Sequence, residues 1–480
     1  MKRALLAAVT AALAFPLPAA AFTPSDPLYP KQYYAAQDHA FDAFGDALPG
    51  LDPVRVAIVD SGIDGTHPEF QPRTRIWAAK SFIGGSPYTD ENGHGTFVAG
   101  EIAAAVNNGQ GIAGIAFPAQ LIIAKIAGAD GTLSLDAEAA AIRWSVDHGA
   151  EVINLSLGGA RDPLDPKIDS FSPEEAAAVE YAVRHRALVV AATGNCGNEV
   201  PSCPWNYADY PAALPHVLGV SALNRTGDVA SFSNRDQIYN DIAAPGQGIL
   251  STVPLAITAQ NPSCTDQGYS DCASADLRGG SGTSFAAPQV AAAAALLLAL
   301  KPTLKPDQLS YVLERTAADE TSANGCKSCA AGRDTYTGWG RLDIQAAIGA
   351  LEGQLPPADR YEPNDDAGAE APTLRGRKVT ATLDFWDDQI DVYRVHLIAK
   401  RRVQFLARGP RGSDIDLLLW RPGTTHVNDL RTQRMRVGQS IGPGASKHIN
   451  YRAPKTGWYY IEVKLETHGF GAYTLSLIRK

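Results

Sequence analysis

The sequence predicts an α/β domain, with a parallel sheet and helices on both faces, followed by a C-terminal all-β sandwich domain. Two observations predict the first domain. Apolar, β-branched runs with little alternation are typical of buried parallel strands, and helical stretches separate these runs. One observation predicts the second domain. After the proline pair at 356–357 the sequence changes to short strands in which apolar and polar residues alternate.

The first domain is expected to alternate strands and helices along the chain. The apolar run Val54–Asp60 is its first buried strand. Later strands are predicted at 121–126, 152–155, 188–192 and 217–221, and helices at 97–106, 136–148 and 173–186. Because ligands and catalytic groups gather at the carboxyl ends of parallel strands, polar residues at these ends are candidates for a functional site.

Length and charge limit the class of protein. The chain has 480 residues, 45% hydrophobic and 19% charged, an ordinary globular composition that is sufficient for more than one core. The net charge is −9 and no long basic or acidic run occurs, so nucleic acid is not an implied partner, nor is an anionic membrane. We expect a monomer whose partner is a protein or a peptide substrate.

The first 21 residues have the three regions of a secretory signal peptide. A positive start, Met1–Arg3, precedes an apolar run, and small residues at Ala19–Ala21 fit a cleavage site. The alternative is a membrane anchor, but the run is short and two prolines follow it. The protein is therefore expected to be secreted, in an extracellular or periplasmic location.

Six cysteines agree with export, because an even count in an exported chain predicts disulfides. The simplest of fifteen connectivities joins local pairs: 196 with 203, 264 with 272, and 326 with 329. The Cys326-Lys-Ser-Cys329 spacing has an alternative reading as a redox or metal site.

Ser284 is a candidate nucleophile. It lies in the stretch Gly279–Pro288, where three glycines allow a tight loop with positive φ and small residues allow a helix to begin directly behind the hydroxyl. Free amides at a helix start stabilise an oxyanion. The alternative is a serine that caps the helix after a flexible loop.

A serine hydroxyl attacks poorly at neutral pH without a neighbouring base, and His94 and Asp60 are candidates for that base and its partner. Asp60 ends the first predicted strand, and His94 stands between glycines at a predicted helix start. Asn195 follows the strand at 188–192, at the same expected sheet edge, and is a candidate oxyanion donor. Singly, Asp60 also fits a turn cap and His94 a structural residue.

Four motifs together resemble the subtilisin family: Asp60 in Asp-Ser-Gly, His94 in Gly-His-Gly-Thr, Asn195 after glycine, and Ser284 in Gly-Thr-Ser-Phe-Ala-Ala-Pro. They occur in the order Asp, His, Ser that is known for subtilisin. Matching residues run from about 26 to 351. The resemblance implies a subtilisin-like fold over residues 22–355, in which Ser284 attacks the scissile carbonyl, His94 transfers the proton, Asp60 orients the imidazole and Asn195 stabilises the oxyanion.

The resemblance also implies substrate-binding residues. Segments 125–131 and 156–159 match strands that pair with the substrate backbone, with candidates Gly128, Ser156, Leu157 and Gly158. Asp209 matches a position near the floor of the pocket for the P1 side chain, where its carboxylate favours arginine or lysine. Alternatives are ordinary strand-end turns, a turn-capping Asp209 and a broad, apolar P1 preference.

Calcium is a further implication, since family members bind it through the loop that matches 106–112. The candidate ligands are Asp26, Glu69 and Asn108. Family members usually carry aspartate at the position of Glu69, and the loop alternatively just ends a helix. A second departure is Phe285, where many members have methionine, beside an enlarged loop at 264–274.

Residues 356–480 resemble the bacterial prepeptidase C-terminal domain, a module of secreted proteases. The resemblance rests on Glu362-Pro-Asn-Asp365, on 388–393, and on predicted strands at 458–463 and 473–478. Some relatives bind calcium through such acidic clusters, and turn-forming residues are the alternative. The whole sequence predicts a secreted serine endopeptidase; the alternatives are a catalytically silent binding protein of the same fold and a transpeptidase or macrocyclase.

Overall fold

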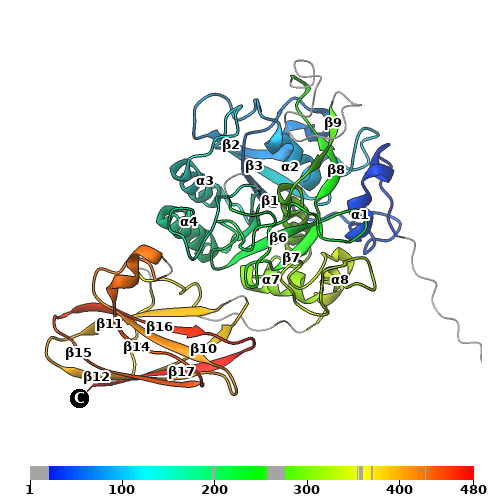
Figure 1. The fold of residues 1–480 in the computed structure, drawn as a ribbon. Coiled ribbons are helices and arrows are strands. Elements are labelled where there is room, and N and C mark those ends of the chain that lie inside the picture. The colour runs from blue at the N-terminus through cyan, green and yellow to red at the C-terminus, as the bar shows by residue number, and fades with distance from the viewer. Residues whose placement is uncertain are drawn as a thin grey trace, which may run out of the picture.

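The computed structural model describes residues 21–196, 200–256, 276–353, 355, 361–368, 371–386, 388–427 and 429–479. Figure 1 shows an α/β unit, coloured blue to yellow-green, beside a smaller unit of strands, coloured yellow to red. We call them the N-terminal domain (up to residue 353) and the C-terminal domain (361–479). The predicted signal peptide, the pair Cys264 and Cys272, and the loop at 264–274 lie outside the described residues, apart from residue 21.

A parallel sheet forms the centre of the N-terminal domain. In the described residues it has seven strands in the order β2-β3-β1-β4-β5-β6-β7, and every neighbouring pair is parallel. The strands are β1 (Val54–Asp60), β2 (Ile76–Ser81), β3 (Ala119–Lys125), β4 (Val152–Leu155), β5 (Leu188–Ala192), β6 (Val217–Leu223) and β7 (Ile242–Pro245). Six of these strands, all except β2, are almost completely buried, as expected for a sheet covered on both sides.

Helices cover both faces of this sheet and create two cores. On one face pack α2 (His94–Ala103), α6 (Ala287–Leu300), α7 (Pro306–Arg315) and α8 (Ile344–Ala350). On the other pack α3 (Leu135–Asp147) and α4 (Pro173–Arg184). Ser134 and Ser172 begin α3 and α4 by accepting a hydrogen bond from a backbone N–H of the first turn. Short α1 (Tyr33–Gln37) and the hairpin of β8 (Gln247–Thr252) and β9 (Leu277–Ser281) complete the domain.

The predicted α/β class is confirmed, and the predicted strands and helices exist with small shifts at their ends. The strands at 152–155 and 188–192 have the predicted bounds. The predicted helix at 97–106 instead begins at His94, because Gly93, at φ 95°, reverses the chain directly before it. The helix thus begins three residues earlier than predicted, and the imidazole of His94 lies on its first turn.

One segment of the described residues, Thr283–Leu300, is long and apolar enough to cross a membrane. In this fold 89% of it is buried inside the N-terminal domain. It contains α6, which packs against β1, β4, β5 and β6 beneath the sheet.

The C-terminal domain is a sandwich of two antiparallel sheets, which confirms the predicted all-β class. One sheet has the order β10-β17-β12-β15 and the other β11-β16-β13-β14. The strands are β10 (Lys378–Asp384), β11 (Ile390–Leu397), β12 (Arg402–Arg408), β13 (Ile415–Trp420), β14 (Arg436–Ser440), β15 (Ser446–Arg452), β16 (Gly457–Leu465) and β17 (Phe470–Arg479). Alternate residues of both sheets fill a core of their own.

Two of the predicted disulfides are present. Cys196 bonds to Cys203 and Cys326 to Cys329, so the reading of the 326–329 spacing as a redox or metal site is not needed to explain it. Both bonds close short surface segments of the N-terminal domain.

Candidate active site

Asp60 and His94 meet at the carboxyl edge of the sheet. Asp60 is the last residue of β1 and His94 the first of α2, and His94 Nδ1 lies 2.9 Å from both carboxylate oxygens of Asp60. Ser61 N also donates to Asp60 Oδ1 at 2.7 Å, which fixes the carboxylate. Burial lowers the pKa of His94, but attraction to Asp60 outweighs burial and the net pKa is raised. The pair can therefore hold a proton on the imidazole for part of a reaction cycle.

Asp90 organises the turn that carries His94, a role that the sequence reasoning missed. Its buried carboxylate accepts hydrogen bonds from Gly93 N at 2.7 Å, Thr96 N at 2.9 Å and Ser61 Oγ at 2.8 Å. Ser61 Oγ in turn accepts from the backbone N–H next to His94. One carboxylate thus ties the start of α2 to the end of β1. An aspartate four residues before His94 was the available signal.

The glycines around the site serve close packing more than an open loop. A Cβ at Gly95 would lie 2.2 Å from the Gly62 carbonyl oxygen, so the glycine lets α2 pack directly behind Asp60. The expected positive φ angles at 279, 280 and 282 are wrong. Residues 279 and 280 lie in β9, and Gly280 has no room for a side chain because a Cβ would meet the Phe285 ring at 2.7 Å.

Ser284 lies in a single 3-10 turn, Thr283–Phe285, directly before α6. Pro288 stands at the start of α6, where its missing N–H is not needed. Ser156 Oγ donates to the Ser284 carbonyl oxygen at 2.7 Å, so Ser156 holds the backbone of the serine turn. Phe285 contacts His94, with ring centroids 5.4 Å apart. The turn that carries the serine therefore contacts the histidine ring through Phe285.

Asn195 follows β5 at the same sheet edge. Its Oδ1 accepts a hydrogen bond from Thr283 N at 2.9 Å, next to Ser284 in the chain. Because the oxygen is engaged, the amide N–H groups are the donors that the side chain has left to offer. The structure thus places the Asn195 side chain against the serine turn. An oxyanion donor has to lie next to the nucleophile.

One pocket of about 370 Å³ connects the serine with several predicted substrate-binding residues. Its lining includes Leu157, Gly158, Asn195, Asp209 and Ser284. Gly128, by contrast, does not line it and lies in the loop after β3.

Asp209 fits between two glycines of the pocket wall. A Cβ at Gly194 would lie 2.0 Å from Asp209 Oδ2, and one at Gly158 would lie 3.1 Å from Asp209 Cβ. Asn234 Nδ2 donates to Asp209 Oδ1 at 3.1 Å. The pocket therefore contains a half-buried carboxylate. Asp209 has room in this position because the residues that face it, Gly158 and Gly194, have no side chain.

The three predicted calcium ligands meet, but hydrogen bonds engage their carboxylates. Asp26 accepts from Asn107 N at 2.8 Å and Asn108 N at 3.0 Å. Glu69 accepts from Asn108 Nδ2 and Ile112 N, both at 2.9 Å, and burial raises its pKa to about 7. A calcium site needs oxygens directed at one point. In the described residues these hydrogen bonds join the trio into a clasp around the 107–112 loop, and calcium at this loop stays a proposal.

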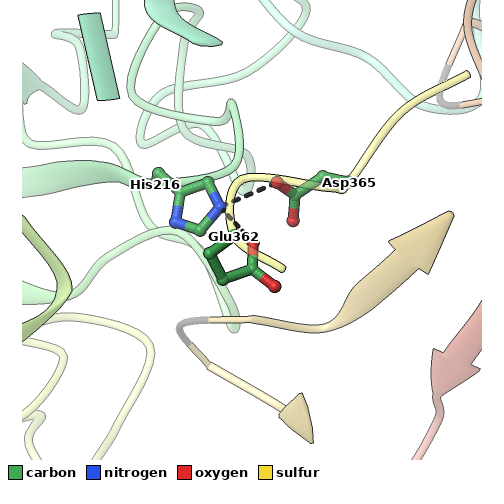
Figure 2. Close-up of side chains that lie close together, drawn as sticks. All are labelled: His216, Glu362 and Asp365. Atoms are coloured by element: carbon green, nitrogen blue, oxygen red, sulfur yellow. Dashed lines mark hydrogen bonds and ion pairs between the residues drawn. The ribbon is translucent and has the colours of Figure 1, made fainter. Parts of the chain in front are cut away.

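Acidic groups with metal-ligand spacing occur at the start of the C-terminal domain. Glu362, Asp388 and Asp391 present three carboxylate oxygens within 4.8 Å of one another, and Glu362 and Asp365 do the same with His216 of the N-terminal domain (Figure 2). The sequence singled out all four carboxylates. It missed His216, because no local pattern relates residue 216 to residue 362.

The N-terminal domain is similar in sequence to known proteases. Residues 52–340 match the family model of the subtilase family. Thermitase of Thermoactinomyces vulgaris is 30% identical over 334 residues, which cover 68% of this chain and 99% of thermitase. The cell wall-associated protease of Bacillus subtilis (strain 168) is 27% identical over 466 residues, 89% of this chain, and the match spans about half of that relative, 48%.

Among solved structures, that of the prenylagaramide maturation protease PagA matches with 27% identity and a TM-score of 0.49, covering 63% of this chain and 94% of that one. The family model covers more than half of the chain and includes Asp60, His94, Asn195 and Ser284. The chain belongs to the subtilase family.

Proposed function

We propose that this protein is a secreted serine endopeptidase that hydrolyses peptide bonds in proteins, with Asp60, His94 and Ser284 as the catalytic triad. The observation that supports this most is the hydrogen-bonded pair of Asp60 and His94 at the same sheet edge as a serine turn that borders a pocket. Family membership agrees with it. Export depends on residues 1–21 acting as a signal peptide, and the two disulfides are in keeping with an oxidising compartment.

In this proposal Ser284 Oγ attacks the scissile carbonyl carbon while its proton passes to His94 Nε2. Asp60 holds the ring through Nδ1 and stabilises the imidazolium that forms. Asn195 donates a hydrogen bond to the carbonyl oxygen as it becomes an oxyanion. His94 then protonates the leaving amine, and water attacks the acyl-enzyme by the same route in reverse.

We further propose that the pocket beside Ser284 takes arginine or lysine at P1. Asp209 lines this pocket, and a basic side chain would pair with its carboxylate. Phenylalanine would remove water from the carboxylate without compensating its charge. The segment directly after β4, with Ser156, Leu157 and Gly158, would pair with the substrate backbone as an added strand. We propose that Gly128, in the loop after β3, pairs with the substrate on the opposite side.

We propose calcium for the oxygen-only group of Glu362, Asp388 and Asp391, because hard carboxylate oxygens suit this ion.

The domain division, 22–355 and 356–480, also stays a proposal, as does the identity of the sandwich as a prepeptidase C-terminal module. The separate core of the sandwich favours both.

Labelling with a fluorophosphonate probe tests the function directly. The probe should modify the parent protein at Ser284 and leave Ser284→Ala unlabelled. The labelled parent should also cleave a denatured protein substrate. Absent labelling of a folded parent would favour the silent binding protein, and joined rather than hydrolysed peptide products would favour a transpeptidase or macrocyclase.

A further inference from the structure

The two domains meet at a buried histidine surrounded by carboxylates. His216, directly before β6, directs Nε2 at Asp365 Oδ2, 2.7 Å away, and at Glu362 Oε2, 3.0 Å away. Figure 2 shows both carboxylates approaching the ring from the first segment of the C-terminal domain. The side chains are 5 to 8% exposed. A polar cluster this well enclosed must satisfy its charges internally.

The other ring nitrogen has an acidic partner as well. His216 Nδ1 lies 3.4 Å from Asp307 Oδ1 on α7. Histidines that bind metals usually donate their second N–H to a carboxylate, which fixes the tautomer and leaves the first nitrogen to the metal. Asp307 is placed for this role, with Nε2 directed at the two carboxylates of the other domain.

Negative charge exceeds positive charge at this cluster. Within the described residues, Glu362, Asp365 and Asp388 form no ion pair with lysine or arginine. Two buried oxygens, Glu362 Oε1 and Asp388 Oδ1, have no hydrogen-bond partner. One imidazolium cannot balance these groups, so the cluster favours a further cation.

The cluster also has room for water ligands. A cavity of about 60 Å³ is lined by His216, Asp307 and Asp365 together with Trp386 and Gln389. A water molecule occupies about 30 Å³ of the liquid, so a small number fit beside three protein ligands.

We propose that His216, Glu362 and Asp365 bind one divalent transition metal of the zinc class and thereby fasten the C-terminal domain to the N-terminal domain. An imidazole nitrogen with two carboxylate oxygens suits zinc, whereas calcium prefers oxygen ligands alone. The site shares Glu362 with the oxygen-only group of Glu362, Asp388 and Asp391 but differs from it by the histidine ligand, and it goes beyond the proposed peptidase activity.

The test measures metal binding on the full chain carrying Ser284→Ala, which prevents autolysis. Titration calorimetry with zinc chloride should give one site per chain. His216→Asn should weaken zinc binding by more than about 100-fold. Loss of a residue that only hydrogen-bonds to a metal ligand lowers affinity by about 10- to 100-fold, and His216 is a ligand itself. Asparagine is chosen because His216 has φ 59°, a conformation that asparagine tolerates. Calcium binding should be the same in both proteins.

Two further variants separate metal ligation from a general effect on the domain boundary. Asp307→Asn should weaken zinc binding by about 10- to 100-fold, as expected for a partner of the ligand. His426→Gln is the matched control, because His426 also pairs with an aspartate, Asp366 at 2.7 Å, near the N-terminal domain. It should bind zinc as the parent does.

Small-angle scattering supplies a structural readout. Zinc should narrow the distribution of distances between the domains in the parent and leave it unchanged in His216→Asn. The proposal is overturned if the parent binds no zinc, if His216→Asn binds zinc with unchanged affinity, or if His216→Asn weakens calcium as much as zinc.

Discussion

Two histidines of this protein each pair with an aspartate through Nδ1, but their surroundings differ. His94 pairs with Asp60 at 2.9 Å and keeps 27% of its side chain exposed beside the serine turn. His216 pairs with Asp307 at 3.4 Å, is 6% exposed, and faces two more carboxylates. One carboxylate balances one imidazolium and leaves the other nitrogen of His94 to accept the proton of Ser284. Three carboxylates keep a cation in place permanently.

A pair of histidine and aspartate does not by itself specify a chemistry. Accessibility and total charge around the second nitrogen decide between proton transfer and cation binding. The following predictions test this contrast from its catalytic side, beginning with the largest effect.

Removing either partner of the proposed proton transfer should abolish turnover. We expect His94→Ala and Ser284→Ala each to lower kcat by about 10⁶-fold, the magnitude known for subtilisin itself, and the double variant to be little worse. Steady-state hydrolysis of a fluorogenic peptide measures this. His148→Gln is the control, because its ring contacts Trp144 of the preceding helix α3 and bonds to the Trp144 carbonyl oxygen. Additive losses in the double variant would show that His94 and Ser284 do not act as a unit.

Replacing Asp60 tests the electrostatic half of the contrast. His94 must be neutral to accept a proton, and because its pKa is raised, activity should be lost on acidification at a higher pH than for an ordinary histidine. Asp60→Asn removes the attraction that raises this pKa, so the midpoint should move to lower pH while kcat falls by roughly 10⁴-fold. The pH dependence of kcat/KM between 5 and 9 measures both. An unmoved midpoint would contradict the role of Asp60.

Asn195 should contribute less than the triad. Asn195→Ala should reduce kcat by about 100- to 1000-fold with little change in KM, as for the equivalent oxyanion donor of subtilisin. Thr283→Val is a useful companion, since the backbone N–H that holds Asn195 Oδ1 remains in place. A higher KM with unchanged kcat would instead assign Asn195 to substrate binding.

The P1 pocket offers the next smaller effect. Asp209→Gly should reduce cleavage after arginine relative to phenylalanine by roughly 10- to 100-fold, since a hydrogen bond to a charged group is worth about 1.5 to 3 kcal/mol. Peptides that differ only at P1 measure the ratio of kcat/KM. Equal or better cleavage after phenylalanine in the parent, with no change in the variant, would end the idea.

The smallest effect is expected from removal of the C-terminal domain. A chain that stops after Leu355 keeps the sheet, both of its helical layers and every residue of the pocket. Peptide hydrolysis should therefore be unchanged, whereas zinc binding should be lost. A shortened chain that cannot fold would refute the proposed division into two domains.

The sequence by itself determined the α/β class, the strand ends that carry Asp60 and Asn195, and the β-sandwich. These follow from short-range patterns: apolar runs, alternation of period two, and glycines beside polar residues. The motif around Ser284 also identified α6, although the glycines proved to serve packing against Phe285 instead of positive φ. Packing of this kind depends on which side chain arrives from elsewhere, and local sequence does not contain that information.

The tertiary structure alone decided what the charged groups do. Asp26 and Glu69 are predicted calcium ligands, and only the structure shows that backbone N–H groups of the 107–112 loop bond to their oxygens. Glu362 and Asp365 read as a local acidic motif, yet a histidine 146 residues earlier in the chain completes their cluster. Electrostatic interactions act through space, so the partner of a carboxylate is fixed only when the domains fold and meet.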